Sequence, residues 1–74
     1  MNSKARKRYL LLRVPNNGPK ALAGPPNDFA TREDAQTRFD EIMSAQIKLH
    51  HTHLEIVAYS GDKYAYLEAQ GILY

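Results

Sequence analysis

Residues 9–14 have the composition of a β-strand, in which successive side chains point to opposite faces. Pro15 follows, and it ends the pattern because proline has no backbone N–H to donate to a neighbouring strand. The sequence therefore predicts a first strand over residues 9–14. Its two rows of side chains are Leu10, Leu12 and Val14 on one face and Tyr9, Leu11 and Arg13 on the other.

A second alternating region, residues 54–69, predicts a β-hairpin that turns at Gly61 and Asp62. A longer turn over residues 60–63 gives the same pairing, so the register does not depend on the type of turn. One face of this hairpin is aliphatic and carries Leu54, Ile56, Ala58, Ala65, Leu67 and Ala69. The other face carries Val57, Tyr59, Tyr64 and Tyr66.

The same register places Glu55 directly opposite Glu68, which is unfavourable unless a basic side chain lies nearby. Arg13 is the basic residue on the equivalent face of the first strand. We therefore expect the first strand to lie next to the hairpin, with Arg13 close to the two glutamates.

Apolar residues between the two strand regions recur at helical spacing and predict a helix from Arg32 to Ala45 or one turn further. Thr31 suits the N-cap position, and Asp34 stands at the third helical position. We expect the apolar stripe to cover the aliphatic face of the sheet after a right-handed crossover. The stripe consists of Ala35, Phe39, Ile42, Met43 and Ile47, with Gln46 as its one polar interruption.

Two segments allow more than one interpretation. Residues 15–28 contain all four prolines of the chain, and they form either a long loop or, at residues 20–23, a short edge strand that folds back on the first strand. The apolar end of the chain, residues 72–74, either docks on the core or inserts into a partner.

These elements predict a small two-layer α+β domain with the order β-loop-α-β-β. Its sheet is mostly antiparallel, with three strands, or four if residues 20–23 pair, and one helix packs on one face. The domain spans residues 9–74, with a loop at 15–30, and residues 1–8 form a basic N-terminal arm. Residues 1–27 carry six basic side chains and no acid, whereas residues 28–74 carry four basic and eight acidic ones.

The composition excludes several classes of protein. No cysteine is present, so the chain has no disulfide and no thiolate metal site, which is typical of a cytoplasmic protein. The apolar run that begins at Tyr9 is too short for a signal-peptide core or a membrane span, so we expect no membrane association.

The candidate binding surface is the aromatic sheet face together with the basic arm. It has three interpretations: an oligomer interface in which two such sheets pack, a face covered by the chain's own loop, arm or tail, or a site for a ligand such as a peptide or single-stranded nucleic acid. Nucleic-acid binding combines rings that stack on bases with cations that follow the phosphates. The candidate residues are Lys7, Arg8, Tyr9, Arg13, Val57, Tyr59, Tyr64 and Tyr66.

Catalytic and metal-binding patterns are weak in this chain. No glycine-rich phosphate loop occurs, and the neighbouring carboxylates Asp40 and Glu41 diverge on the predicted helix. The tract of His50, His51 and His53 is more simply a polar connector than a metal site. We expect no catalytic residue, no metal and no cofactor. The sequence favours a non-catalytic interaction module whose partner is another protein or a second copy, with single-stranded nucleic-acid binding as the alternative.

Overall fold

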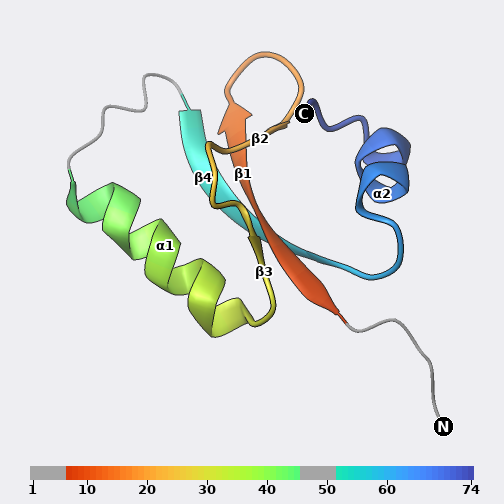
Figure 1. Ribbon diagram of the computed structural model, residues 1–74. Coiled ribbons are helices and arrows are strands. Elements are labelled where there is room, and N and C mark those ends of the chain that lie inside the picture. Colours follow the sequence, from red (N-terminus) through yellow and green to blue (C-terminus); the bar gives the residue numbers. More distant parts are fainter. Residues whose placement is uncertain (1–6, 46–51) are drawn as a thin grey trace, which may run out of the picture.

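The chain forms three layers, in which a small antiparallel sheet separates two helices (Figure 1). A computed structural model describes residues 7–45 and 52–74. The elements in chain order are β1 (Arg8–Pro15), β2 (Ala21–Leu22), β3 (Asp28–Phe29), α1 (Arg32–Ser44), β4 (Thr52–Tyr59) and α2 (Lys63–Gln70). The predicted α+β class and mostly antiparallel sheet are confirmed. Among the described residues, no helix combines the length and the apolar character needed to cross a bilayer.

Strand β1 is the centre of the sheet. It pairs with β4 along its whole length, from Arg8 opposite Tyr59 to Pro15 opposite Thr52. Its other edge pairs with β2 and then with β3, so these two short strands lie one after the other beside β1. Residues 21–22 thus confirm the edge-strand interpretation. All these pairings are antiparallel, so the expected right-handed crossover, a rule for parallel strands, does not apply.

Helix α1 begins and packs largely as its sequence predicts. The Thr31 hydroxyl oxygen accepts a hydrogen bond from the backbone N–H of Asp34 at 3.1 Å, which satisfies a free donor at the helix start. Ala35 and Ile42 are buried against the sheet. Met43 is an exception, because 53% of it is exposed. The expected continuation through Gln46 and Ile47, like His50 and His51, lies outside the described residues.

The prediction that residues 63–69 form the second strand of a hairpin is wrong, because residues 63–70 form helix α2. Asp62 caps this helix by accepting hydrogen bonds from the N–H groups of Tyr64 at 2.9 Å and Ala65 at 3.4 Å. Gly71 ends it in the left-handed region at φ 69°, a conformation that glycine adopts without strain. The buried side of α2 carries Lys63, Tyr66 and Leu67, which is helical rather than alternating spacing.

The two helices bury opposite faces of the sheet. Leu10, Leu11 and Leu12 are fully buried because β1 is covered on both sides. The cluster beneath α2 consists of Leu10, Leu12, Tyr59, Leu67 and Ile72, with Val14, Leu22, Val57 and Tyr66 packed against it. The cluster beneath α1 consists of Leu11, Ala23, Ile42 and Leu54, with Phe29, Phe39 and Ile56 packed against it.

This arrangement corrects the predicted composition of the two sheet faces. The register of β1 and β4 places Tyr9 opposite Ala58, Leu11 opposite Ile56 and Arg13 opposite Leu54. Directly opposite residues share a face, so the side chains of Tyr9, Leu11 and Arg13 lie on the α1 side. Val57 and Tyr59 belong to the α2 side. The expected open face that combined both rows does not exist.

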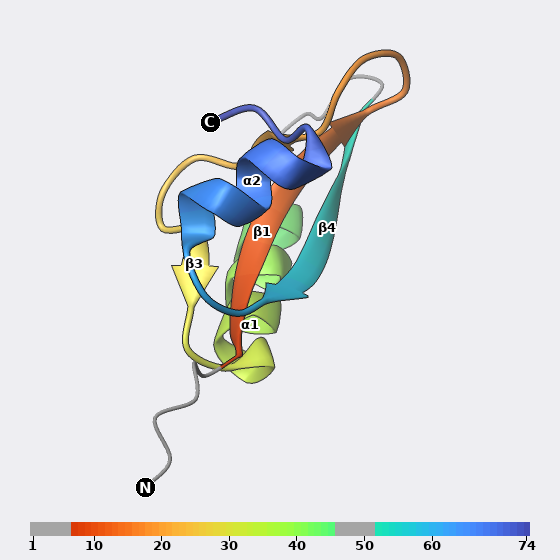
Figure 2. The same cartoon turned by 90° about the vertical axis from the view of Figure 1, so that its right-hand side faces the viewer.

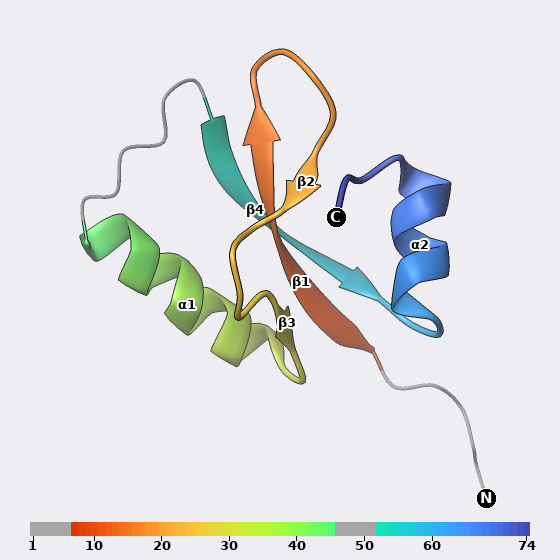
Figure 3. The same ribbon diagram turned by 45° about the horizontal axis from the view of Figure 1, so that its top comes forward.

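The last residues of the chain close the α2 side. Ile72 is 5% exposed and belongs to the core. The Leu73 N–H donates to the carbonyl of Lys20 at 2.8 Å, and the Leu73 carbonyl accepts from the N–H of Leu22 at 2.9 Å. Figure 3 shows this segment beside β2. The docking interpretation of the chain end therefore holds for Ile72 and for the backbone of Leu73.

We predict that Asp62→Ala lowers the free energy of unfolding by about 0.5–2 kcal/mol, because two N–H groups at the start of α2 lose their acceptor. Urea titration followed by circular dichroism measures this loss. Ser60→Ala, two residues earlier at another exposed position, is the control and keeps the wild-type unfolding midpoint. Equal midpoints for the two variants would contradict the cap.

Candidate functional site

The structure does not gather the eight candidate binding residues on one surface. They fall into groups in different layers of the fold. Lys7 precedes β1 and Arg8 begins it, whereas Tyr9 and Arg13 lie on the α1 side of the sheet. Val57, Tyr59 and Tyr66 pack beneath α2, whereas Tyr64 is exposed on α2.

The carboxylate of Asp28, in β3, contacts three polar side chains, which come from β1, β4 and α2. Its Oδ1 is 2.9 Å from the Arg8 Nε, and its Oδ2 accepts a hydrogen bond from the Tyr59 hydroxyl at 3.0 Å. The Lys63 Nζ lies 3.6 Å from the same Oδ2. One half-buried carboxylate thus connects β1, β4 and α2 to β3.

These contacts shift the proton affinities of two groups. Burial raises the pKa of Tyr59, and the hydrogen bond to Asp28 and the charge of Asp28 raise it further. The pKa of Arg8 is raised by its hydrogen bond to Asp28 and by the charge of that carboxylate. Tyr59 therefore stays neutral and Arg8 stays charged at physiological pH.

Tyr59 and Tyr66 are part of the core and not of a binding surface. Tyr59 is 6% exposed, and its ring centroid lies 5.6 Å from that of Tyr66. Of the three interpretations of the aromatic face, coverage by the chain's own C-terminal region therefore applies to these rings and to Val57.

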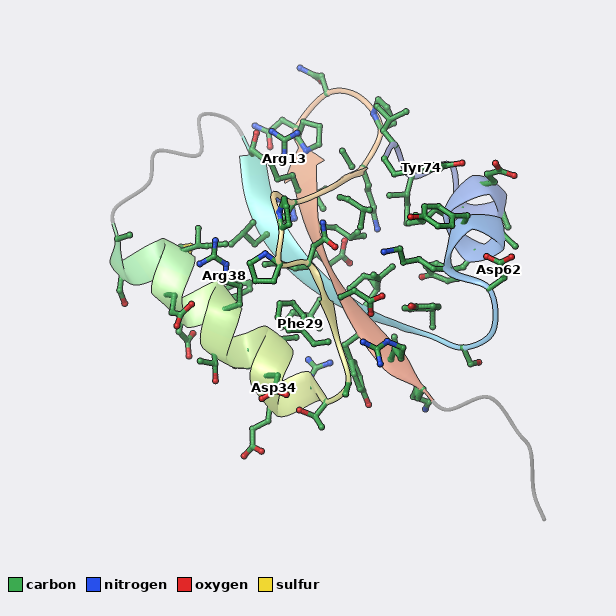
Figure 4. The ribbon with its side chains drawn as sticks, viewed as in Figure 1. Arg13, Phe29, Asp34, Arg38, Asp62 and Tyr74 are labelled. Carbon is green, nitrogen blue, oxygen red and sulfur yellow. The ribbon has the colours of Figure 1, made fainter. Side chains whose placement is uncertain are left out.

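An exposed apolar group lies instead on α2 and at the end of the chain, and we call it the C-terminal aromatic cluster. It consists of Tyr64, Leu73 and Tyr74, which are 53%, 56% and 63% exposed. The rings of Tyr64 and Tyr74 have centroids 5.2 Å apart and planes inclined by 51°. Figure 4 shows Tyr74 beside α2.

Polar contacts hold this cluster in place. The Tyr74 hydroxyl donates to Glu68 Oε2 at 2.8 Å, and this hydrogen bond, with some burial, raises the pKa of Tyr74. The Lys63 Nζ lies 5.3 Å from the centre of the Tyr64 ring, within the range of a cation–π contact. Sequence analysis missed Tyr74 as a site residue, although the apolar character of residues 72–74 was its available signal.

A pocket of about 250 Å³ adjoins the cluster, with Leu73 in its wall. Arg13, labelled in Figure 4, also lines the pocket, and its side chain makes no hydrogen bond or ion pair with another described residue. The other lining residues are Pro15, Asn17, Gly18, Pro19, Ala21 and Thr52. A pocket with apolar walls and one guanidinium suits a side chain or chain end that is partly apolar and negatively charged.

Glu55 pairs with another base, so the Arg13 side chain has no carboxylate partner among residues 7–45 and 52–74. The Lys20 Nζ lies 2.9 Å from Glu55 Oε1, so the expectation that Arg13 would neutralise Glu55 and Glu68 is wrong. Glu68 is on α2 and accepts from Tyr74, away from Glu55. The physical reason is the helix, which removes Glu68 from the sheet.

Metal binding finds no support in the described ranges 7–45 and 52–74, where no group of three or more His, Cys, Asp or Glu side chains is placed to hold an ion. His53 is exposed at the beginning of β4. Its two neighbours in the histidine tract lie outside these ranges.

Comparison with known proteins gave no relative. No family model matches the chain. No curated protein and no solved structure matches it either. The surfaces of the molecule itself are therefore the basis for a proposed function.

We predict that Tyr59 ionises above the ordinary tyrosine value, and that Asp28→Asn lowers its pKa towards that value. The pKa of Tyr59 is higher in the folded than in the unfolded protein. Its contribution to the free energy of unfolding is therefore fully present at a pH below the unfolded-state pKa, and it is lost as the pH rises through the folded-state pKa. The tyrosine ¹³Cζ shift measures the titration. Glu55→Gln removes a distant carboxylate as control, and an equal effect of both variants would contradict the role of Asp28.

Proposed function

We propose that this chain is a small non-catalytic protein-interaction module that binds a partner protein through the C-terminal aromatic cluster. The observation that carries the proposal is the exposed ring pair of Tyr64 and Tyr74, each more than half exposed, with the exposed Leu73 next to Tyr74 in the chain. Tyrosine is enriched at protein interfaces because it combines a large apolar ring with a polar tip. Such side chains at the centre of an interface often supply much of the binding energy.

The cluster is preorganised, which favours binding. Tyr64 is fixed on a capped helix, the backbone of Leu73 is hydrogen-bonded to the strand region at residues 20–22, and Tyr74 is held by Glu68. Side chains that are already ordered lose less conformational entropy when a partner binds. A rigid aromatic surface of this kind is suited to a protein partner.

The adjoining pocket extends the same surface through Leu73. Its walls are largely apolar, and Arg13 offers a guanidinium that no described residue neutralises. Arginine at an interface pairs with carboxylates through two parallel hydrogen bonds. We infer a partner that presents an apolar residue to the rings and an acidic group to Arg13.

Single-stranded nucleic acid is less favoured as the ligand. Phosphates need free cations beside the stacking rings, but Lys63 and Arg8 are both engaged by Asp28. The acidic residues Asp62 and Glu68 are close neighbours of the cluster and would repel a polyanion.

We predict that Tyr64→Ala combined with Tyr74→Ala weakens binding of the partner by at least about tenfold, because both rings are contact residues. A photo-crosslinking residue at position 74 identifies the partner, and titration of the purified partner measures the loss. Both tyrosines are exposed, so we expect the variant to remain folded. Met43→Ala removes an equally exposed apolar side chain from α1, and it leaves binding unchanged.

Salt distinguishes the two kinds of ligand. An apolar protein interface is insensitive to rising salt or becomes tighter, whereas phosphate contacts weaken steeply. Crosslinks from position 74 to nucleic acid, or equal losses for the tyrosine and Met43 variants, would overturn the proposal.

A further inference from the structure

We propose that the outer edge of β4 pairs with the same edge of a second copy, so that the chain forms a symmetric dimer with one continuous antiparallel sheet. This inference goes beyond the aromatic cluster, which lies on another part of the molecule. The proposal rests on three features of β4: the direction of its backbone N–H and carbonyl groups, the absence of residues that prevent edge strands from pairing, and the register that two copies would adopt.

The hydrogen bonds of β1 fix which groups of β4 point outward. The Leu11 N–H donates to the carbonyl of Asn27 at 2.9 Å, and the Leu11 carbonyl accepts from the N–H of Ala23 at 3.0 Å, so Leu11 points away from β4. Successive residues of a strand point to opposite edges, so Leu10 and Leu12 point towards β4.

Leu10 and Leu12 are opposite Val57 and Glu55, which therefore bond to β1. The N–H and carbonyl groups of Leu54, Ile56 and Ala58 consequently point to the other edge. No backbone hydrogen bond to another described segment uses them.

Nothing in the part of the chain that the structure describes lies beside this edge. Figure 2 shows β4 at the border of the sheet, with α1 and α2 over the two faces and not over the edge. Natural edge strands usually avoid pairing by means of prolines, lysines, bulges or short length. β4 has eight residues and contains no proline, glycine or lysine, and its one carboxylate, Glu55, is paired with Lys20.

Two copies fit best with the symmetry axis at Ile56. Leu54 of each copy then lies opposite Ala58 of the other, and Ile56 lies opposite its own counterpart. These are the outward-pointing residues, so the pairs exchange about six backbone hydrogen bonds. The side chains form an apolar row on the α1 side, and no like charges are opposed.

The adjacent register, with its axis at Glu55, is less favourable. It would place Glu55 directly opposite Glu55 in a closely spaced pair, with Cα atoms about 4.5 Å apart. With the axis at Ile56, Glu55 lies opposite Val57 of the second copy and keeps its contact with Lys20. Charge therefore disfavours the register with its axis at Glu55, and the interface is isologous, as in most homodimers.

Amide hydrogen exchange of the wild-type protein tests the pairing without any substitution. Raising the concentration from micromolar to millimolar slows exchange of the Leu54, Ile56 and Ala58 amides about tenfold or more, because only they gain acceptors. The Glu55 and Val57 amides are already bonded to β1 and do not change with concentration. Sedimentation shows a species of about twice 8.4 kDa in parallel. A monomer at every concentration, or self-association without this alternating pattern, overturns the proposal.

Substitutions of opposite charge at Ile56, on the proposed symmetry axis, distinguish a variant that no longer pairs from one that no longer folds. Ile56→Lys and Ile56→Glu each place like charges opposite one another and are monomeric, whereas their mixture forms a heterodimer. Restored association shows that both variants fold. Self-association that survives both substitutions, or that is abolished instead by Tyr64→Ala with Tyr74→Ala, overturns the edge pairing and leaves the aromatic cluster to be judged by its own experiment.

A single cysteine tests the register, because the natural chain contains none. Ile56→Cys oxidises to a covalent dimer, since the two Cα atoms are about 5.5 Å apart in a hydrogen-bonded pair. Glu55→Cys does not, because its two Cα atoms are more than about 7 Å apart in this register. Crosslinking of Glu55→Cys alone overturns the proposed axis.

Discussion

The fold depends on the need to cover β1 on both faces. Three consecutive leucines, Leu10 to Leu12, project alternately to the two sides of the sheet, and all three are fully buried. A single helix would leave one side in water, at a cost of roughly 1.5–3 kcal/mol for each large apolar side chain. Helix α1 covers Leu11, while α2 and Ile72 cover Leu10 and Leu12. The second helix is therefore a requirement of the central strand and not an appendage to it.

A polar contact positions the layer on the α2 side. Hydrophobic burial has no direction, so it does not by itself fix how a short helix sits on a sheet. Asp28 supplies direction, because it contacts Tyr59 on β4 and Lys63 on α2 from the opposite edge of the sheet. Its position in a half-buried site strengthens these contacts relative to open solvent. The exposed rings of the C-terminal aromatic cluster are oriented by the same helix.

The parts of the fold that sequence analysis predicted are those with a single physical solution. The α1 start at Thr31 combines a cap with helical spacing, and both agree. Residues 63–70 satisfy two patterns at once. Read as a strand, they place Tyr64 and Tyr66 on one face and Ala65, Leu67 and Ala69 on the other, and read as a helix they place Lys63, Tyr66 and Leu67 on one side. The Gly61–Asp62 pair is equally a turn signal and a helix cap, so local chemistry does not separate hairpin from helix. The choice depends on the uncovered side of β1, which is a tertiary constraint. The predicted site depended on the hairpin and is dispersed in the structure, and only Tyr64 and Arg13 of its residues remain in the proposed binding surface.

The central strand is also the first element of the domain to be synthesised. Its partners follow at residues 21–29 and 52–59, and the last residue that covers its α2 side is Ile72. A growing chain therefore presents Leu10 to Leu12 to its surroundings until almost all of the domain has left the ribosome. Contacts between residues far apart in the sequence are typical of slow folding, and the leucine run is the apolar segment that depends on them most.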